Sequence, residues 1–139
     1  MSVLHLYSKG CEYAIHALSN ISRAECRSGF AVKSVCKKAG LPEPFTRKIF
    51  QTLVKNRILI AKRGPGGGYR FKKDPEKISV LSIVYAIDGK NTFDKCVAKN
   101  NQCDSGKNCS LHPMWKKTKN HLINQLKKST VAELMKEEA

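Results

Sequence analysis

Residues 43–73 read EPFTRKIFQTLVKNRILIAKRGPGGGYRFKK, and this stretch decides the fold that we predict for the 139-residue chain. Pro44 suits the first turn of a helix, and apolar residues then recur at helical spacing as far as about Lys55. Residues 58–63 and 69–73 read as two strands joined by a glycine-rich segment. A helix followed by such a hairpin predicts a mainly α-helical winged helix-turn-helix domain with a small β-hairpin.

The predicted helix separates two kinds of side chain. Its apolar face is expected to carry Phe45, Ile49, Phe50, Leu53 and Val54. Its polar face carries Arg47, Lys48, Gln51, Thr52 and Lys55. Such a face can be merely solvated, but beside a hairpin whose arms are also basic it favours contact with nucleic acid.

Two further helices are predicted upstream. The first begins after the N-cap residue Ser8 and places apolar residues on one face as far as Ile21. Residues 23–30 read as a loop, and residues 32–39 then form a short helix that ends at Gly40. The short helix and the basic helix after it would form the helix-turn-helix.

Downstream of the hairpin, Ser79 is expected to cap a buried helix over residues 80–87. Pro113 opens a longer helix with an apolar stripe, and Thr130 then caps a short final helix. We assign the stripe to dimerisation, with packing against its own domain as the alternative. The residues assigned to the dimer contact are Leu111, Trp115, Thr118, Leu122 and Leu126.

The length of the chain fits one compact domain with an appended helix. We assign residues 1–90 to the winged helix-turn-helix domain, residues 91–112 to a cysteine-containing loop, and residues 113–139 to the dimerisation helix and a C-terminal helix. The sequence contains neither a long apolar run nor a secretory signal, so we expect a cytoplasmic protein that does not associate with membranes.

The positive charge of the chain is concentrated in one third of its length. The formal net charge is +15, and 13 basic against three acidic residues lie between Lys33 and Lys77. Solubility needs a smaller excess, so this segment indicates a polyanionic partner, either a nucleic acid such as double-stranded DNA or an acidic membrane surface. The predicted DNA contacts are Thr46, Arg47, Lys48, Gln51, Lys55, Lys62, Arg63, Gly66, Gly67, Tyr69 and Arg70.

Three of the six cysteines are scattered through the N-terminal part of the chain. Cys11 and Cys36 fall at apolar positions of predicted helices, where a free cysteine packs as a small apolar residue. Cys26 belongs to the same group. We therefore expect all three to pack in the core.

The other three cysteines form a different pattern. Cys96, Cys103 and Cys109 lie in a polar segment that offers no core to fill, and His112 follows the last of them at close spacing. Three thiols and an imidazole form a set of metal ligands, but structural zinc sites usually contain a Cys-x-x-Cys pair. Thiolates spread along a loop favour an iron–sulfur cluster, with zinc and a disulfide switch as the alternatives.

The chain resembles the IscR-like family of bacterial transcription regulators over nearly its whole length. The resemblance is carried by Ser8-Lys9-Gly10 followed by Tyr13-Ala14, by the hairpin string Arg63-Gly64-Pro65-Gly66-Gly67-Gly68-Tyr69, and by the three clustered cysteines followed by His112 and Trp115. It implies a homodimer of winged-helix domains crossed by a long C-terminal helix, with an iron–sulfur cluster in the loop before that helix.

The resemblance also implies a type of cluster. Members that bind a [2Fe-2S] cluster carry a histidine that matches His112, and a [4Fe-4S] cluster is the other form. Some members instead use a carboxylate near the N-terminus of the partner subunit, where this chain has Ser8, a poor ligand; His5 is a second candidate. Six residues separate Cys96 from Cys103, one more than in the relatives that match best.

The predicted recognition helix departs from the family pattern as well. Arg47 and Lys48 stand where IscR-like relatives carry acidic and amide residues that read their operator. The resemblance thus implies the same mode of DNA binding with a different preferred sequence.

These observations predict a homodimeric regulator that binds a pseudo-palindromic operator under the control of an iron–sulfur cluster. The signal would be iron–sulfur status, iron, redox state or nitric oxide. A cluster-free thiol-redox regulator of the same fold and a small iron–sulfur carrier are the alternatives. We expect no enzyme, because no Ser/His/Asp arrangement, paired-carboxylate site or nucleotide-binding loop is present.

Overall fold

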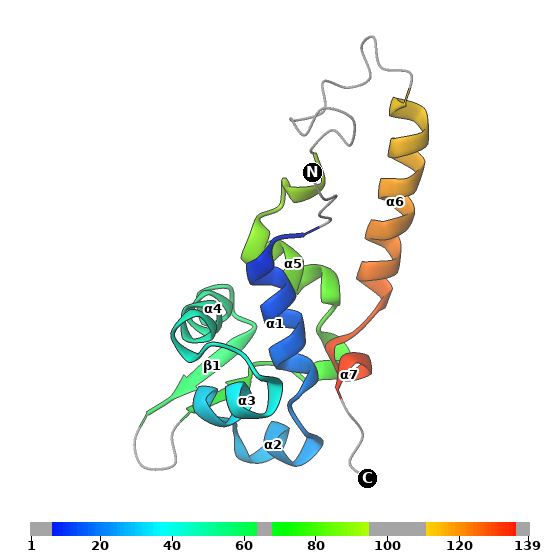
Figure 1. The fold of residues 1–139 in the computed structure, drawn as a ribbon. Helices are drawn as coiled ribbons and strands as arrows, with labels where there is room; N and C mark the ends of the chain where they lie inside the picture. The colour runs from blue at the N-terminus through cyan, green and yellow to red at the C-terminus, as the bar shows by residue number, and fades with distance from the viewer. Residues whose placement is uncertain (1–6, 64–67, 95–110, 136–139) are drawn as a thin grey trace.

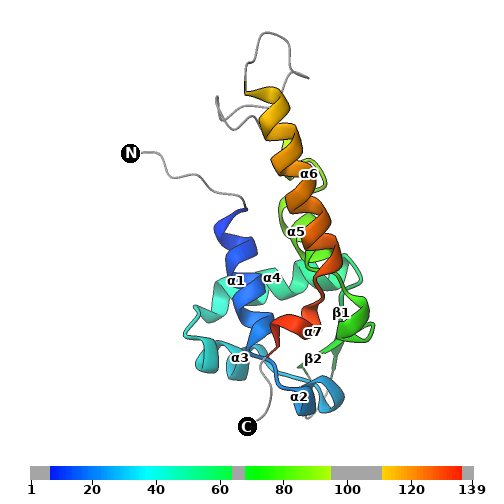
Figure 2. The same ribbon diagram turned by 90° about the vertical axis from the view of Figure 1, so that its right-hand side faces the viewer.

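The computed structural model describes residues 7–63, 68–94 and 111–135. A small hairpin lies at one edge of the group of helices, and one long helix rises along the side of the fold (Figures 1 and 2). The helices are α1 (Lys9–Ser19), α2 (Arg23–Ser28), α3 (Val32–Ala39), α4 (Glu43–Lys55), α5 (Val80–Asp88), α6 (His112–Lys128) and α7 (Val131–Leu134). The strands are β1 (Leu59–Lys62) and β2 (Gly68–Phe71), and the short 3-10 turns are η1 (Pro75–Lys77) and η2 (Thr92–Asp94).

This architecture confirms the predicted mainly α-helical fold with a two-stranded antiparallel hairpin. Helices α3 and α4 form the helix-turn-helix, and Gly40 ends α3 in the left-handed conformation that favours glycine. Buried side chains from α1, α3, α4, α5 and the hairpin form one core cluster. Its largest fully buried members include Phe50, Leu18, Ile21 and Leu53.

Helix α1 is tied at its start to the end of α5. The Ser8 hydroxyl accepts a hydrogen bond from the Cys11 amide at 3.1 Å, as the N-cap prediction requires. The Ser8 backbone N–H donates to Asp88 Oδ2 at 2.8 Å, and the Ser8 hydroxyl donates to the other oxygen of that carboxylate. The N-terminus of α1 and the C-terminus of α5 are therefore held side by side.

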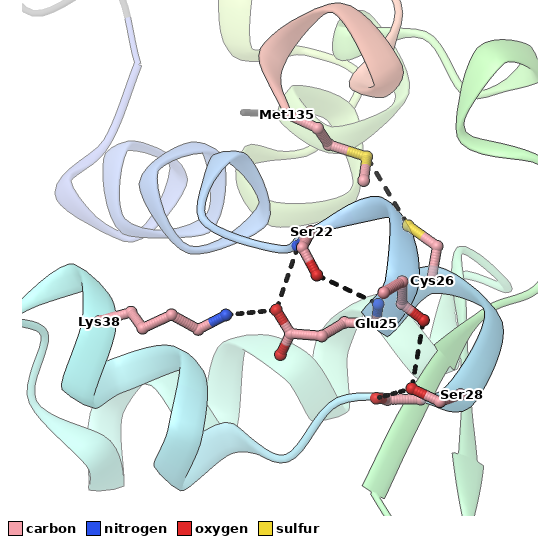
Figure 3. A network of polar contacts seen from close by, with 8 residues as sticks. Ser22, Glu25, Cys26, Ser28, Lys38 and Met135 are labelled. Atoms are coloured by element: carbon pink, nitrogen blue, oxygen red, sulfur yellow. Dashed lines mark hydrogen bonds and ion pairs between the residues drawn. The ribbon is translucent and has the colours of Figure 1, made fainter. Parts of the chain in front are cut away.

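The predicted loop over residues 23–30 is wrong, because the structure forms α2 there. The Ser22 hydroxyl accepts from the Glu25 amide, and the Glu25 carboxylate accepts from the Ser22 amide, so both halves of a capping box are present (Figure 3). Lys38 of α3 forms an ion pair with Glu25. The helix has no buried residue. Its sequence accordingly shows no apolar stripe, which is the pattern from which a helix is predicted.

Partial burial and polar contacts have opposite effects on the pKa of Glu25. Burial alone would raise the pKa of this carboxyl group, but the hydrogen bond and charge of Lys38, together with hydrogen bonds from Ser22, lower it. Glu25 is thus held as a carboxylate, which keeps α2 attached to α3.

The buried edge of α4 differs from the prediction by one residue at its first turn. Thr46 is fully buried with Ile49, Phe50 and Leu53, whereas Phe45 is 42% exposed. Positions 46, 49, 50 and 53 follow the i, i+3, i+4, i+7 spacing of one helix face, which explains the exchange. The prediction of Thr46 as a DNA contact and that of Phe45 as a core residue are therefore both wrong.

The hairpin strands are shorter than predicted, and they receive a third contact from outside. Leu59 pairs with Phe71 and Lys62 with Gly68, in antiparallel register. Phe30 adds a bridge to Tyr69 through backbone hydrogen bonds of 2.9 and 2.7 Å. A Cβ atom at Gly68 would lie 2.5 Å from the Phe30 carbonyl oxygen, so this close approach requires glycine.

The C-terminal residues return to the first domain. Val131 and Met135 belong to the main core cluster. The Val80 amide donates to the Ser129 carbonyl oxygen at 2.8 Å, and the Val131 amide donates to the Ile78 carbonyl oxygen at 2.8 Å. Helix α7 thus packs in the core of the domain that we assigned to residues 1–90.

A substitution at Thr46 tests whether this residue is buried in the core. Its Oγ1 atom is buried and has no hydrogen-bond partner in the part of the chain that the structure describes. A buried hydroxyl without a partner costs about 1–3 kcal/mol, so Thr46→Val should stabilise the fold by about 1 kcal/mol in urea unfolding.

Thr52→Val is the matched control, because the Thr52 hydroxyl donates to the Lys48 carbonyl oxygen at 3.1 Å and is partly exposed. We expect no stabilisation from this change. Equal stabilisation by both changes, or a loss of stability in Thr46→Val, would contradict the placement of Thr46.

Candidate nucleic-acid interface

The outer face of α4 is basic and open to solvent. Arg47, Lys48, Gln51 and Lys55 are all exposed, as predicted for a DNA-facing helix. Arg47 Nη2 lies 2.6 Å from Glu43 Oε1, one turn earlier, and its side chain is 50% exposed. A surface ion pair of this kind contributes little to stability. The guanidinium group can therefore exchange Glu43 for another acceptor at small cost.

The hairpin places a second set of basic residues next to α4. Lys62, Arg63 and Arg70 are exposed, and α4 packs against β1. Tyr69 is only partly exposed, because its ring lies edge-on to Phe50 with 5.2 Å between centroids. The predicted contacts Gly66 and Gly67 lie outside the described residues.

Phe45 is an exposed residue beside the basic face of α4, and the sequence pattern did not predict its exposure. Its ring packs edge-on against Tyr13 of α1, with 5.2 Å between centroids and an interplanar angle of 86°. Counting the helical period from Thr46 rather than Phe45 would have revealed its exposure.

The predicted metal ligands fall mostly beyond the described part of the chain. Cys96, Cys103 and Cys109 lie outside the described residues, and His112 is the first residue of α6. Within residues 7–63, 68–94 and 111–135, no three His, Cys, Asp or Glu side chains lie close enough together to hold a metal ion. A metal site built by the described residues alone is therefore absent.

The N-terminal cysteines are free thiols within the fold. Cys11 and Cys36 are buried, which confirms their expected packing. Burial, and to a smaller extent the nearby Asp88 carboxylate, raises the pKa of Cys11 to about 12. This thiol is therefore protonated at neutral pH, and a protonated thiol is a poor metal ligand and nucleophile.

Cys26 is only partly buried, so its predicted packing holds in part. Its Sγ atom lies 3.8 Å from Met135 Sδ, which joins α2 to the end of α7 (Figure 3). Burial raises the pKa of this thiol, against a smaller lowering by Arg23. Cys26 also lines a cleft of about 420 Å³. The basic residues that line this cleft are Arg23, Arg27, Lys72 and Lys73.

The apolar stripe of α6 divides into two parts. Leu122, Ile123 and Leu126 pack against buried residues that include Cys11 and Val84, so this part contacts its own domain. The N-terminal part extends past the end of α5 (Figures 1 and 2), and there Leu111 is 46% and Met114 is 53% exposed. Trp115 is partly buried and Thr118 is exposed.

No helix in the described ranges is long and apolar enough to cross a membrane.

Comparison with known proteins finds a matching family and similar transcription regulators. The profile of the Rrf2 family, described as "Iron-dependent Transcriptional regulator", matches residues 7–137. The HTH-type transcriptional regulator IscR of Vibrio campbellii is 28% identical over 134 residues, which cover 96% of this chain and 79% of the relative. The regulator of the same name from Vibrio vulnificus is 29% identical over 132 residues, which cover 95% of this chain and 77% of the relative.

Two solved structures share the fold. CymR of B. subtilis, described as its global cysteine regulator, superposes with a TM-score of 0.77 at 16% identity, over 96% of each chain. The structure of T. potens IscR gives a TM-score of 0.70 at 24% identity, over 96% of this chain and 85% of the other. Both comparisons support the same winged-helix architecture.

Proposed function

The chain belongs to the Rrf2 family of transcriptional regulators, and we propose that it acts as a homodimer whose affinity for an operator is controlled by an iron–sulfur cluster. The proposal is carried by one observation. The exposed basic face of α4, the second helix of a helix-turn-helix, lies beside an exposed basic hairpin. This is the arrangement by which winged-helix proteins contact duplex DNA.

In this proposal α4 enters the major groove. Arg47 and Lys48, on the N-terminal half of the helix, reach base edges, with Gln51 one turn behind Arg47. In free protein Glu43 holds the Arg47 guanidinium group in its ion pair. On binding, Arg47 would exchange this carboxylate for acceptors on a guanine.

The hairpin has a different task. Lys62, Arg63 and Arg70 are exposed on its two arms and would contact phosphates. Their neighbour Tyr69 packs on Phe50 of α4, so the basic arms and the recognition helix keep a fixed spacing. We therefore propose sequence reading by α4 and positioning by the hairpin.

A second copy of the chain would supply the symmetry of the operator. Two recognition helices bind a pseudo-palindrome when they lie about one helical turn of DNA, roughly 34 Å, or a multiple of it apart. We propose that the dimer contact is formed by the exposed N-terminal part of α6, because Leu111 and Met114 are large apolar residues without cover in the described chain. Leu122 and Leu126 instead support the domain.

The donor set of Cys96, Cys103, Cys109 and His112 fits an iron–sulfur cluster by its chemistry, since three thiolates and one imidazole suit iron. When bound, such a cluster would supply ligation that depends on redox state between the three cysteines and the first turn of α6. His112 stands at that first turn. We propose a [2Fe-2S] cluster because His112 occupies the position of the histidine ligand in IscR-like proteins.

The packing of α6 offers a path from the proposed cluster ligands to the DNA face. Leu122 and Leu126 of α6 lie on a cluster that includes Val84 of α5, and α5 in turn packs against α4. A displacement of the start of α6 would therefore change both the dimer contact and the support of the recognition helix. This is the physical basis that we propose for regulation.

The DNA face can be tested with duplexes selected from a random library. Arg47→Ala should cost about 1–3 kcal/mol at one base pair and relax the preference there. Lys62→Ala should weaken binding to all sequences and reduce the salt slope by about one. Fluorescence anisotropy over a range of salt concentrations measures both effects.

Asn124→Ala on the exposed surface of α6 serves as the control and should change neither quantity. Equal behaviour of Arg47→Ala, Lys62→Ala and the control would show that DNA binds elsewhere.

The dimer can be tested with charge on its proposed contact. The double change Leu111→Glu and Met114→Glu should give a folded monomer in light scattering, because buried unpaired carboxylates oppose association. Asn120→Glu is the matched control, because Asn120 is exposed on the same helix away from Leu111. A double variant that stays dimeric would place the interface elsewhere.

The cluster can be tested by anaerobic reconstitution with iron and sulfide, followed by visible absorption and metal analysis. Alanine at Cys96, Cys103 or Cys109 should abolish the chromophore, whereas Cys26→Ala should leave it intact. His112→Cys should retain a cluster with a lower reduction potential, because thiolate adds negative charge to the ligand set. A colourless wild-type protein, or one with stoichiometric zinc, would contradict the proposed cofactor.

A further inference from the structure

Phe45 is a large apolar side chain placed on an otherwise charged surface. It lies in the first turn of α4 and is 42% exposed, although the next residue, Thr46, is fully buried. Lys48 lies one turn later on the neighbouring exposed part of the helix, whereas Arg47 projects from the other side of it. The ring therefore lies at the edge of the face that we propose to enter the major groove, next to Lys48.

The ring is held in place on one side. Tyr13 of α1 contacts it edge-on at 5.2 Å between centroids, and Lys9 Nζ lies 5.5 Å from the centroid of the Tyr13 ring. Lys9 is also paired with Glu12 at 3.3 Å, and both side chains are exposed. These contacts restrict the Phe45 ring before any partner arrives, so little conformational entropy is lost on binding.

The position of the ring decides which partner it fits. The N-terminal residues of a recognition helix are those that contact base edges. In the major groove the one apolar group is the C5-methyl group of thymine, and phenylalanine is among the side chains that contact it. Glu12, which precedes Tyr13 in α1, and Glu43 of α4 are each paired with a basic residue, and the exposed Lys48 lies one turn after Phe45 on α4.

We infer that Phe45 selects a thymine in each half-site of the operator through apolar contact with its methyl group. The inference rests on the proposed DNA-binding function and adds a specificity residue to it. Arg47 and Lys48 would read polar base edges, whereas Phe45 reads the methyl group of a neighbouring base pair.

The test begins with selection of duplex sequences by the wild-type chain and by Phe45→Ala, in both the apo and the reconstituted forms. We expect the wild-type motif to contain a thymine at which Phe45→Ala shows no preference. Replacing that thymine by uracil removes only the methyl group. Wild-type affinity should then fall roughly fourfold, the equivalent of one buried methyl-sized group.

Three controls separate a specific contact from damage to the fold. Phe45→Ala should bind the thymine and uracil duplexes equally, whereas Phe45→Leu should still prefer thymine because it keeps an apolar side chain. Uracil at the other thymines of the motif should have no effect that depends on residue 45. Thermal unfolding of both variants reports the loss of the Tyr13 contact separately.

The outcomes are distinguishable. If wild-type protein selects a motif but tolerates uracil at every thymine, the inference on Phe45 is wrong while the DNA-binding function stands. An equal uracil penalty in wild type and Phe45→Ala would contradict the inference in the same way. Failure of the wild-type chain to enrich any sequence would overturn the proposed function, and the inference with it.

Discussion

The position of the Phe50 side chain determines how the two basic elements of this protein are arranged. Phe50 is fully buried, and its ring lies 6.0 Å from that of Phe30 and 5.2 Å from that of Tyr69. One side chain of α4 thus contacts both the segment before α3 and the second strand of the hairpin. Because interiors are close-packed, a change of this residue would shift the basic face of α4 relative to the basic hairpin arms.

Much of the fold could be predicted from the sequence, because its helices carry regular apolar stripes and marked ends. Ser8 and Gly40 are such end signals, and the glycine-rich hairpin is another. The buried side of the first turn of α4 was predicted wrongly, since Phe45 is more apolar than Thr46 yet lies outside the period set by Ile49 and Phe50. Hydrophobicity and helical period disagreed at that point, and the period was the better guide.

Other parts were harder to predict for different physical reasons. Helix α2 is stabilised by its capping box and by the Lys38 ion pair rather than by buried residues, so periodicity could not reveal it. The stripe on α6 shows that an apolar face exists without showing which surface covers it, and Leu122 proved to pack within its own domain. For the candidate site, the exposed basic residues were predictable from charge, whereas the proposal of Cys96, Cys103 and Cys109 as ligands rests on donor chemistry and resemblance.

DNA binding across α4 and the hairpin is the central proposal for this protein, and amide chemical-shift mapping with a selected duplex tests it most directly. We expect the largest changes on adding DNA to fall within residues 43–51 and on the exposed arms of the hairpin. Residues of α7, which packs against α1 and η1 away from α4, should change little (Figure 1). The proposal would be contradicted if the largest changes fell on α7 while the amide chemical shifts of α4 stayed the same.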